Sequence, residues 1–260
     1  MEERTVLLEK NAGIATITLN RPAALNSLNG ALVKELTEIL LDVQSDTDVR
    51  AIVLTGGGKA FCAGGDLFYL LSIQGLAAAR RFIVDAGRIT SIIMNMEKPV
   101  IAMVNGVAAG AGFNLALACD VVFCAKSVKF AQSFAKVGLV PDCGGMYLLP
   151  RVVGLHKAKE LMFTAGLIDA DTAKELGIVN HVVEDDQLKD AVCEFAAKMA
   201  DSAPIAIGLM KRVLNRSDNL DLETVLEFEA DMQTLCLQTA DHKEGVAAFK
   251  EKRVPIFKGM

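Results

Sequence analysis

The sequence predicts an α/β fold with a buried parallel sheet, followed by a helical C-terminal region. Over the first two thirds of the chain, short and almost continuously apolar segments alternate with segments in which apolar residues recur at helical spacing. This alternation is typical of buried parallel strands joined by helices. The last quarter of the chain has helical spacing almost throughout. A helical appendage to an α/β core is therefore expected.

The first half of the chain carries the predicted strands. Apolar segments at 5–8 and 14–19 flank the turn sequence Asn11-Ala12-Gly13, which indicates a hairpin. A strand over 51–54 is stopped by the glycine run 56–58. The other elements expected here are helices over 30–44, about 76–95 and 111–118, and strands over 99–104 and 121–125.

The second half is mostly helical. One further strand is expected over 178–183. Helices are expected near 155–165, 170–176, 186–200, 204–216, 222–239 and 241–250. Because proline favours the first turn of a helix, Ser202-Ala203-Pro204 is the expected junction. We therefore expect a core of residues 1–200 and a helical region of residues 201–260.

Composition excludes several classes of protein. With 260 residues and 52% hydrophobic content, the chain can bury a large core, which excludes collagen-like, disordered and disulfide-scaffold proteins. The 27 basic and 32 acidic residues give a net charge of −5, which disfavours nucleic-acid binding. The six cysteines show no CxxC pair, as expected in a reducing compartment. No signal peptide or membrane-length apolar run is evident, so a cytoplasmic location without membrane contact is expected.

Three glycine-rich loops, at 55–67, 105–112 and 138–145, each follow an apolar strand, where ligands bind in α/β sheets. A phosphate-binding loop is excluded by Val53 and Ala60, and the dinucleotide motif survives only as a weak alternative. Glycine and alanine leave main-chain N–H groups accessible, and a helix start points them outward. Gly65 and Ala111 are the candidate donors of an oxyanion hole.

Titratable candidates are few. The three histidines share no nucleophile or ligand spacing, and no cluster supports a metal site. Asp142 is the only carboxylate in the apolar stretch 137–149, where a raised pKa would suit proton transfer. It equally fits the N-cap of a helix beginning near Gly144. Asp66 is interpreted first as a helix cap.

Together these residues resemble the crotonase, or enoyl-CoA hydratase/isomerase, superfamily. The resemblance implies a spiral of ββα turns, acyl-CoA substrates, no separate cofactor, and C-terminal helices that build homotrimers or dimers of trimers. The segments that carry it are Asn20-Arg21-Pro22, Leu25-Asn26-Ser27-Leu28, Ala60 to Leu67, Lys98 to Ala102, Asn105 to Gly112 and Ala240 to Arg253.

The resemblance also implies roles for individual residues. It matches the oxyanion-hole donors to the N–H groups of Gly65 and Ala111. It places substrate and CoA contacts at Ala24, Leu25, Ala63, Gly65, Asp66, Leu67, Phe68, Ala111, Phe134, Phe249 and Lys252, the last two often reaching a neighbouring subunit's ligand. Where many members have a basic residue after the Arg-Pro pair, this chain has Ala23. Arg21 or another cation must then meet the CoA phosphates, or nothing does.

Two departures concern the chemistry. The positions of the two glutamates that hydratases of this family use hold Asn114 and Phe134, so ordinary hydration is expected to be weak or absent. The segment Val137 to Gly145 resembles instead the isomerase branch typified by the epoxyphenylacetyl-CoA isomerase of phenylacetate breakdown, in which the matching aspartate, Asp142, is catalytic. Phe134, with Phe113, Met146 and Tyr147, is expected either to line an apolar acyl pocket or to belong to the core.

The sequence therefore predicts an acyl-CoA isomerase, of fatty-acid or aromatic-acid degradation, in which Asp142 shifts a double bond by proton transfer. Two alternatives remain at this point. One is an enoyl-CoA hydratase with an atypical site, and the other is a CoA-ester-binding scaffold without catalysis. The RNA binding known in some relatives is disfavoured by the net charge.

Overall fold

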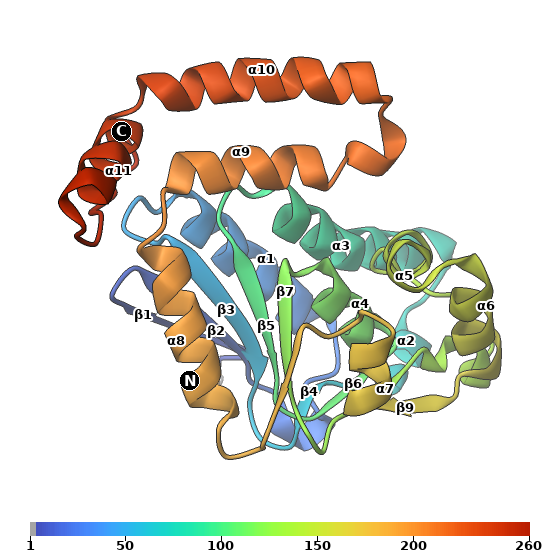
Figure 1. The fold of residues 1–260 in the computed structure, drawn as a ribbon. Coiled ribbons are helices and arrows are strands. Elements are labelled where there is room, and N and C mark those ends of the chain that lie inside the picture. Colours follow the sequence, from blue (N-terminus) through green and yellow to red (C-terminus); the bar gives the residue numbers. More distant parts are fainter. Residues whose placement is uncertain (1–3) are drawn as a thin grey trace.

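The computed structural model describes residues 4–260 and contains two sheets (Figure 1). The large sheet has the strand order β1-β2-β3-β5-β7-β10, in which β1 is antiparallel to β2 and the other neighbours are parallel. Its strands are β1 (Val6–Asn11), β2 (Ile14–Leu19), β3 (Ala51–Gly56), β5 (Val100–Val104), β7 (Val121–Ala125) and β10 (His181–Val183). The small sheet has the order β4-β6-β8-β9. Its strands are β4 (Ala60–Cys62), β6 (Val107–Ala109), β8 (Lys129–Ala131) and β9 (Leu167–Asp169).

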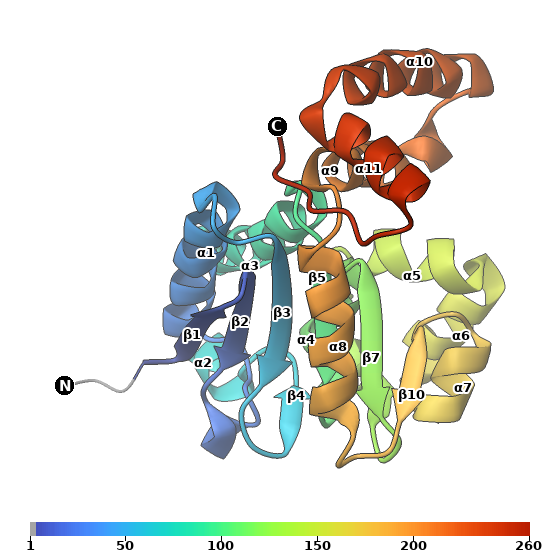
Figure 2. The same ribbon diagram turned by 60° about the vertical axis from the view of Figure 1, so that its left-hand side comes forward.

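Helices cover the sheets and form the C-terminal region. Helix α8 packs on β3, β5 and β7, and α4 lies behind the same strands (Figure 2). The helices are α1 (Gly30–Ser45), α2 (Leu67–Ser72), α3 (Leu76–Asn95), α4 (Ala111–Ala118), α5 (Gly145–Val153), α6 (Leu155–Thr164), α7 (Ala170–Glu175), α8 (Leu188–Ala200), α9 (Pro204–Leu214), α10 (Leu222–Gln238) and α11 (Ala240–Glu251). Three short 3-10 helices are η1 (Pro22–Ala24), η2 (Ser133–Val137) and η3 (Ser217–Asn219).

The chain repeats one unit three times. Each unit adds a strand to the large sheet, then a strand to the small sheet, then helical structure: β3-β4-α2, β5-β6-α4 and β7-β8-η2. The three small-sheet strands pair in parallel, with Cys62 opposite Ala108 and Ala108 opposite Phe130. The spiral of ββα turns expected from the resemblance is confirmed.

Burial explains why these segments take these conformations. Every residue of β3 is buried, as its continuous apolar run requires. Helix α4 is short and made largely of small residues, and seven of its eight residues are buried, so it runs through the core rather than along its surface. Asn29 caps α1 by accepting from the Leu32 N–H.

Most expected elements occur within a few residues of their expected bounds, and 111–118 and 121–125 occur at the same residues. The strand expected over 178–183 covers only His181–Val183. The N–H groups of Ile178 and Val179 donate to the Ala173 carbonyl and not to a neighbouring strand. The small sheet was not expected, because strands of three residues are too short to produce a periodic pattern.

One buried cation fastens the C-terminal helices to the core. Lys211 of α9 is 7% exposed, and its Nζ donates to Asp120 Oδ2 at 2.7 Å and to the Lys98 carbonyl at 3.0 Å. The same Asp120 oxygen accepts from the Val100 N–H at 2.7 Å. Helices α10 and α11 lie beyond α9 (Figure 1). The division into residues 1–200 and 201–260 stays a prediction. Within residues 4–260, no helix has the length and apolarity that crossing a membrane requires.

We predict that Lys211→Met lowers the free energy of unfolding by about 2 kcal/mol, because it removes the cation from a largely enclosed carboxylate. Arg212→Met is the matched control: Arg212 is exposed and lies 3.8 Å from Glu97, so its loss should cost less than about 0.5 kcal/mol. Urea unfolding of both variants at equal protein concentration measures the difference. Equal midpoints would contradict the anchoring role of Lys211.

Candidate active site

The candidate site lies where three neighbouring strands of the small sheet end. Strands β4, β6 and β8 run parallel, so their carboxyl ends share one edge. The segments that leave this edge are Ala63 to Gly65 after β4, Gly110 and Ala111 after β6, and Gln132 to Phe134 after β8. The fold thus brings the sequence-predicted donors Gly65 and Ala111 together from residues far apart in the chain.

The Gly65 N–H is oriented by a short parallel bridge to Leu28. The Leu28 N–H donates to the Gly64 carbonyl at 2.7 Å, and the Leu28 carbonyl accepts from the Asp66 N–H at 2.9 Å. In such a bridge the N–H of the residue opposite, Gly65, points away from the partner strand. Within the described part of the chain this N–H has no acceptor.

The Ala111 N–H belongs to the first residue of α4, where helix N–H groups have no partner within the helix. Gly64 lies beside it: an ideal Cβ on Gly64 would be 3.5 Å from Ala111 N and 2.9 Å from the Ala109 carbonyl oxygen. Gly64 also has φ +101°, a conformation that other residues rarely adopt. Glycine at 64 therefore lets the Gly65 segment approach the start of α4.

Asp142 lies in the loop between η2 and α5. Its Oδ1 is buried and has no hydrogen-bond partner among residues 4–260. Burial raises the pKa of this carboxyl, and the neighbouring Cys143 thiol offsets only part of that rise. The N-cap hypothesis is wrong, because the residue that caps α5 is Gly144 and no side chain bonds to the helix start. The cap assigned to Asp66 is confirmed, since Asp66 accepts from the Tyr69 N–H.

The loop that contains Asp142 is held in place through its own main-chain carbonyls, which accept hydrogen bonds. The Asp142 carbonyl accepts from Asn114 Nδ2 at 2.8 Å and from the Gly145 N–H at 2.9 Å. The Cys143 carbonyl accepts from Thr90 Oγ1 at 2.9 Å, and Cys143 has φ +45°. Because Asn114 lies one turn into α4, the loop is tied to the helix whose first N–H is that of Ala111. The backbone of Asp142 is therefore fixed beside α4.

Phe134 lies at the same helix start. An ideal Cβ on Gly110 would be 3.5 Å from Phe134 Cζ, and the Phe134 ring is buried. Phe113 is fully buried and packs on Phe130 with ring centroids 5.2 Å apart, so it belongs to the core. Tyr147 is exposed, with the Arg151 guanidinium 3.4 Å above its ring.

The other predicted contact residues fall into two groups. Leu25 lies beside Ala63, whose N–H donates to the Leu25 carbonyl at 3.0 Å, with Ala24 next to it in η1. Residues 66–68, with the 88% exposed Phe68, form the cap and first turn of α2. Phe249 and Lys252 belong to α11 and its C-cap, far from α2 and α4 in Figures 1 and 2. Within one chain these two groups are not brought together.

Arg21 does not present a free cation. Its guanidinium donates to Asp66 Oδ2 at 2.9 Å and to the Ser27 carbonyl at 2.6 Å. Burial acts to raise the pKa of Asp66, but hydrogen bonds from the Tyr69 N–H and from Arg21 bring it below the usual aspartate range. Arg21 therefore organises the loop that pairs with residues 63–66.

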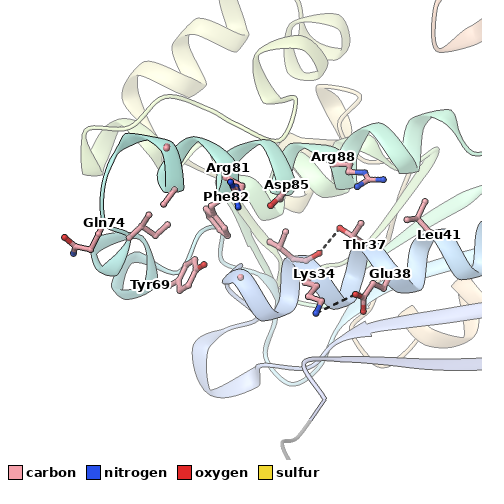
Figure 3. A pocket seen from close by; sticks show the side chains of 15 residues that line it. Lys34, Thr37, Glu38, Leu41, Tyr69, Gln74, Arg81, Phe82, Asp85 and Arg88 are labelled. Carbon is pink, nitrogen blue, oxygen red and sulfur yellow. Dashed lines mark hydrogen bonds and ion pairs between the residues drawn. The ribbon is translucent and has the colours of Figure 1, made fainter.

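A separate groove of about 810 Å³ lies between α1 and α3 (Figure 3). Tyr69 and Phe82 lie at one end of the groove, and Lys34 and Glu38 form an ion pair along α1. The groove contains none of the residues at the small-sheet edge. Within residues 4–260 no group of three metal-ligating side chains occurs there or elsewhere.

Sequence reasoning missed the residues that support the loop. Thr90 and Gln132 are both buried, and both donate through their side chains: Thr90 to the Cys143 carbonyl and Gln132 Nε2 to Asn114 Oδ1 at 2.7 Å. Neither stands in a recognisable motif, because each contacts a distant segment. The glycine-rich turn at 63–65 was the one signal that could have indicated Gly64.

Comparison with known proteins fits this architecture. A model of the enoyl-CoA hydratase/isomerase family matches residues 9–260. The chain belongs to this family, the crotonase superfamily. Its activity is therefore that of the enoyl-CoA hydratase/isomerase family, which acts on acyl-CoA thioesters.

Individual members of the family resemble the whole chain. It is 39% identical over 254 residues to the short-chain-enoyl-CoA hydratase of Clostridium acetobutylicum, covering 97% of both chains. It is 40% identical over 258 residues to the 1,2-epoxyphenylacetyl-CoA isomerase of Escherichia coli, covering 98% of both. The crystal structure of an enoyl-CoA hydratase from Bacillus anthracis matches 98% of this chain and 100% of its own, with a TM-score of 0.95 and 36% identity. Overall similarity does not separate hydratase from isomerase.

We predict that Gly64→Ala reduces turnover of enoyl-CoA thioesters about 10²-fold or more, because the added Cβ would separate the Gly65 segment from Ala111. Gly75→Ala is the matched control. Gly75 has a similar φ of +80°, but a Cβ there would meet nothing within 4 Å. Steady-state kinetics and thermal unfolding of both variants separate backbone strain from damage to the site. Equal activity losses would contradict the prediction.

Proposed function

We propose that this family member is an acyl-CoA isomerase in which Asp142 moves a proton along the acyl chain. The N–H groups of Gly65 and Ala111 hold the thioester oxygen. The observation that carries the proposal is the buried carboxyl oxygen of Asp142, which has no partner among residues 4–260 and lies on a loop tied to α4. In this proposal, the oxygen faces a C–H bond of the substrate and removes its proton.

The proton shuttle balances with one carboxylate. From a 3-enoyl-CoA, Asp142 takes the proton at the α-carbon, and the electron pair of that bond moves toward the thioester oxygen to give a dienolate. The carboxylic acid then returns the proton to the γ-carbon, and the double bond comes to rest between the α- and β-carbons. The two N–H groups stabilise the oxygen as it gains charge, each by about 3 kcal/mol.

The environment of Asp142 suits both halves of this shuttle. Burial raises the pKa of the carboxyl, which makes it a stronger base than an exposed aspartate. As the pH falls through this raised pKa, the carboxylate is protonated and the base is lost. Activity should therefore fall on the acid side at a higher pH than the usual aspartate range allows.

The two positions that distinguish hydratases support isomerisation. Both polar atoms of the Asn114 amide are engaged, one with the Asp142 carbonyl and one with Gln132, so Asn114 is not available to orient water. Phe134 carries no proton to transfer. Activation of water would need a second acid or base, and these positions supply none.

The same carboxyl argues against a scaffold without catalysis. A buried carboxyl oxygen without a partner lowers the stability of a fold. A protein that only binds CoA esters gains nothing from such a group. Retaining it is consistent with a role in proton transfer.

The surroundings of the site suggest an apolar acyl group. The buried Phe134 ring beside Gly110 supplies an apolar wall, which suits a hydrophobic or cyclic acyl chain. CoA would follow the surface formed by residues 24–25, 63 and 66–68. Because Arg21 is paired with Asp66 and position 23 is alanine, the CoA phosphates would depend on other cations. Lys252 of a neighbouring subunit is the one that the resemblance implies.

We also propose that the C-terminal helices build a homotrimer or a dimer of trimers. Helix α10 buries none of its residues, although Leu222, Leu226 and Leu235 are each more than half exposed. On α11, Phe249 is 86% exposed. An apolar surface of this kind is expected to be covered by other subunits. Light scattering after size-exclusion chromatography should give three or six chains per particle, and a monomer would contradict the proposal.

The decisive experiment is deuterium exchange into acyl-CoA esters, followed by NMR in D₂O. The panel contains crotonyl-CoA, 3-hexenoyl-CoA and 1-cyclohexenylacetyl-CoA. We predict deuterium at the α- and γ-carbons with the wild type, because the carboxylic acid of Asp142 exchanges its proton with D₂O over repeated transfers. Asp142→Asn, which retains the shape of the side chain but not its basicity, should lower this exchange about 10²-fold or more.

Asp169→Asn is the control for this experiment, because Asp169 is an exposed cap of α7. It should exchange like the wild type. Accumulation of a hydrated product without α- or γ-deuteration would instead support an atypical hydratase. Equal exchange by the wild type and Asp142→Asn would exclude Asp142 as the base.

A further inference from the structure

The Asn114 side chain is buried and bonded to other residues of the protein, so it is not exposed to a substrate. It is 0% exposed, and its amide is used at both ends: Nδ2 donates to the Asp142 carbonyl at 2.8 Å, and Oδ1 accepts from Gln132 Nε2 at 2.7 Å. An amide rotated by 180° would place Oδ1 against a carbonyl oxygen and Nδ2 against an N–H donor. The Asp142 carbonyl can only accept, so it fixes the Asn114 amide with Nδ2 toward Asp142, and Gln132 donates to the Oδ1 on the other side.

Gly145 makes room for this contact. An ideal Cβ on Gly145 would lie 2.3 Å from Asn114 Nδ2 and 2.6 Å from Asn114 Oδ1, so any other residue at 145 would displace the amide. The Gly145 N–H also donates to the Asp142 carbonyl, at 2.9 Å. Two donors thus converge on one carbonyl oxygen, that of the residue whose carboxyl is the proposed base.

In the part of the chain that the structure describes, the Gln132 side chain makes one hydrogen bond, as a donor to Asn114 Oδ1. It is 1% exposed, and its Oε1 has no hydrogen-bond partner within residues 4–260. An unpaired amide oxygen in the interior is unfavourable, so the contribution of this side chain is the N–H that it gives to Asn114.

We propose that Asn114 and Gln132 form a positioning pair that fixes the direction of the Asp142 carboxyl. The proposal rests on the isomerase function proposed above, and it gives position 114 a role other than water activation. The pair acts through neutral groups. A carboxylate at position 114 could not donate to the Asp142 carbonyl, and it would place a second negative charge beside the base.

The titratable groups near Asp142 allow the pair to be tested by pH. The neighbours that interact with its charge are the thiols of Cys62, on β4, and Cys143. Burial raises the pKa of Cys62 to about 12 and raises that of Cys143 as well, so both thiols are neutral at mildly acid and neutral pH. Of these three groups, only Asp142 then titrates on the acid limb of the rate profile.

The first test is Asn114→Asp, which preserves shape but replaces the donor with a charge. With 3-hexenoyl-CoA as the probe, we expect the midpoint of the acid limb of kcat to rise by about one pH unit or more, because like charges raise the pKa of the base. KM should change by less than about twofold, since the thioester contacts are untouched. Asn215→Asp is the matched control: Asn215 also donates to a main-chain carbonyl, that of Met94 at 2.8 Å, but it does not contact Asp142.

The second test, Gln132→Leu, separates positioning from folding. It removes an unpaired buried oxygen along with the donor, so the midpoint of thermal unfolding should equal that of the wild type. The value of kcat should fall about tenfold or more. This variant also decides the matter if Asn114→Asp does not fold. An unmoved acid limb in folded Asn114→Asp, or wild-type kcat in Gln132→Leu, would overturn the positioning role.

Failure of the isomerase proposal would look different. In that case Asp142→Asn would exchange deuterium like the wild type. If Asp142→Asn abolishes exchange while both position-114 and position-132 variants behave as the wild type, only the positioning pair is disproved.

Discussion

The parallel pairing of β4, β6 and β8 is the constraint on which the candidate site depends. Neighbouring strands of a sheet lie about 4.8 Å apart, so the segments that leave them at a shared edge begin side by side. Here these segments bring the Gly65 N–H, the Ala111 N–H and the Phe134 ring to one place. None of these three groups comes from a strand of the large sheet. That sheet buries the core that keeps the three short strands in register.

Two aspartates near this edge show how the fold sets the properties of one residue type. Asp66 is paired with Arg21 and accepts the Tyr69 N–H, and its pKa lies below the usual range. Asp142 lacks a cationic partner among the described residues, and burial raises its pKa. The loop of Asp142 is held by a hydroxyl and an amide, which are neutral. Because both groups donate to main-chain carbonyls, they restrain the backbone of Asp142 without donating to its carboxyl.

The sequence was sufficient for the parts of the fold that depend on local patterns. Apolar runs of four to six residues identified β3, β5 and β7, and a run rich in small residues identified α4 at its observed bounds. The donors Gly65 and Ala111 could be proposed because glycine-rich turns after strands expose N–H groups. The three-residue strands of the small sheet, however, carry no periodic signal. Thr90 and Gln132 act on segments at least 18 residues away in the chain, which local patterns cannot show. Asp142 was ambiguous because a cap and a catalytic acid have the same local sequence; the structure removes the cap alternative, since Gly144 occupies that position, and leaves the catalytic role a proposal.

The contact between Lys211 and Asp120 sets where the C-terminal helices join the core. Asp120 accepts from the N–H of Val100, the first residue of β5, so α9 is attached at the amino end of the large-sheet strands. The candidate oxyanion donors, Gly65 and Ala111, follow the carboxyl ends of β4 and β6, at the other end of the same ββα units. Changes in α10 can therefore alter the proposed contacts between chains while leaving the candidate donors Gly65 and Ala111 in place. The exposed apolar surface of α10 and the candidate donors thus occupy separable ends of one scaffold.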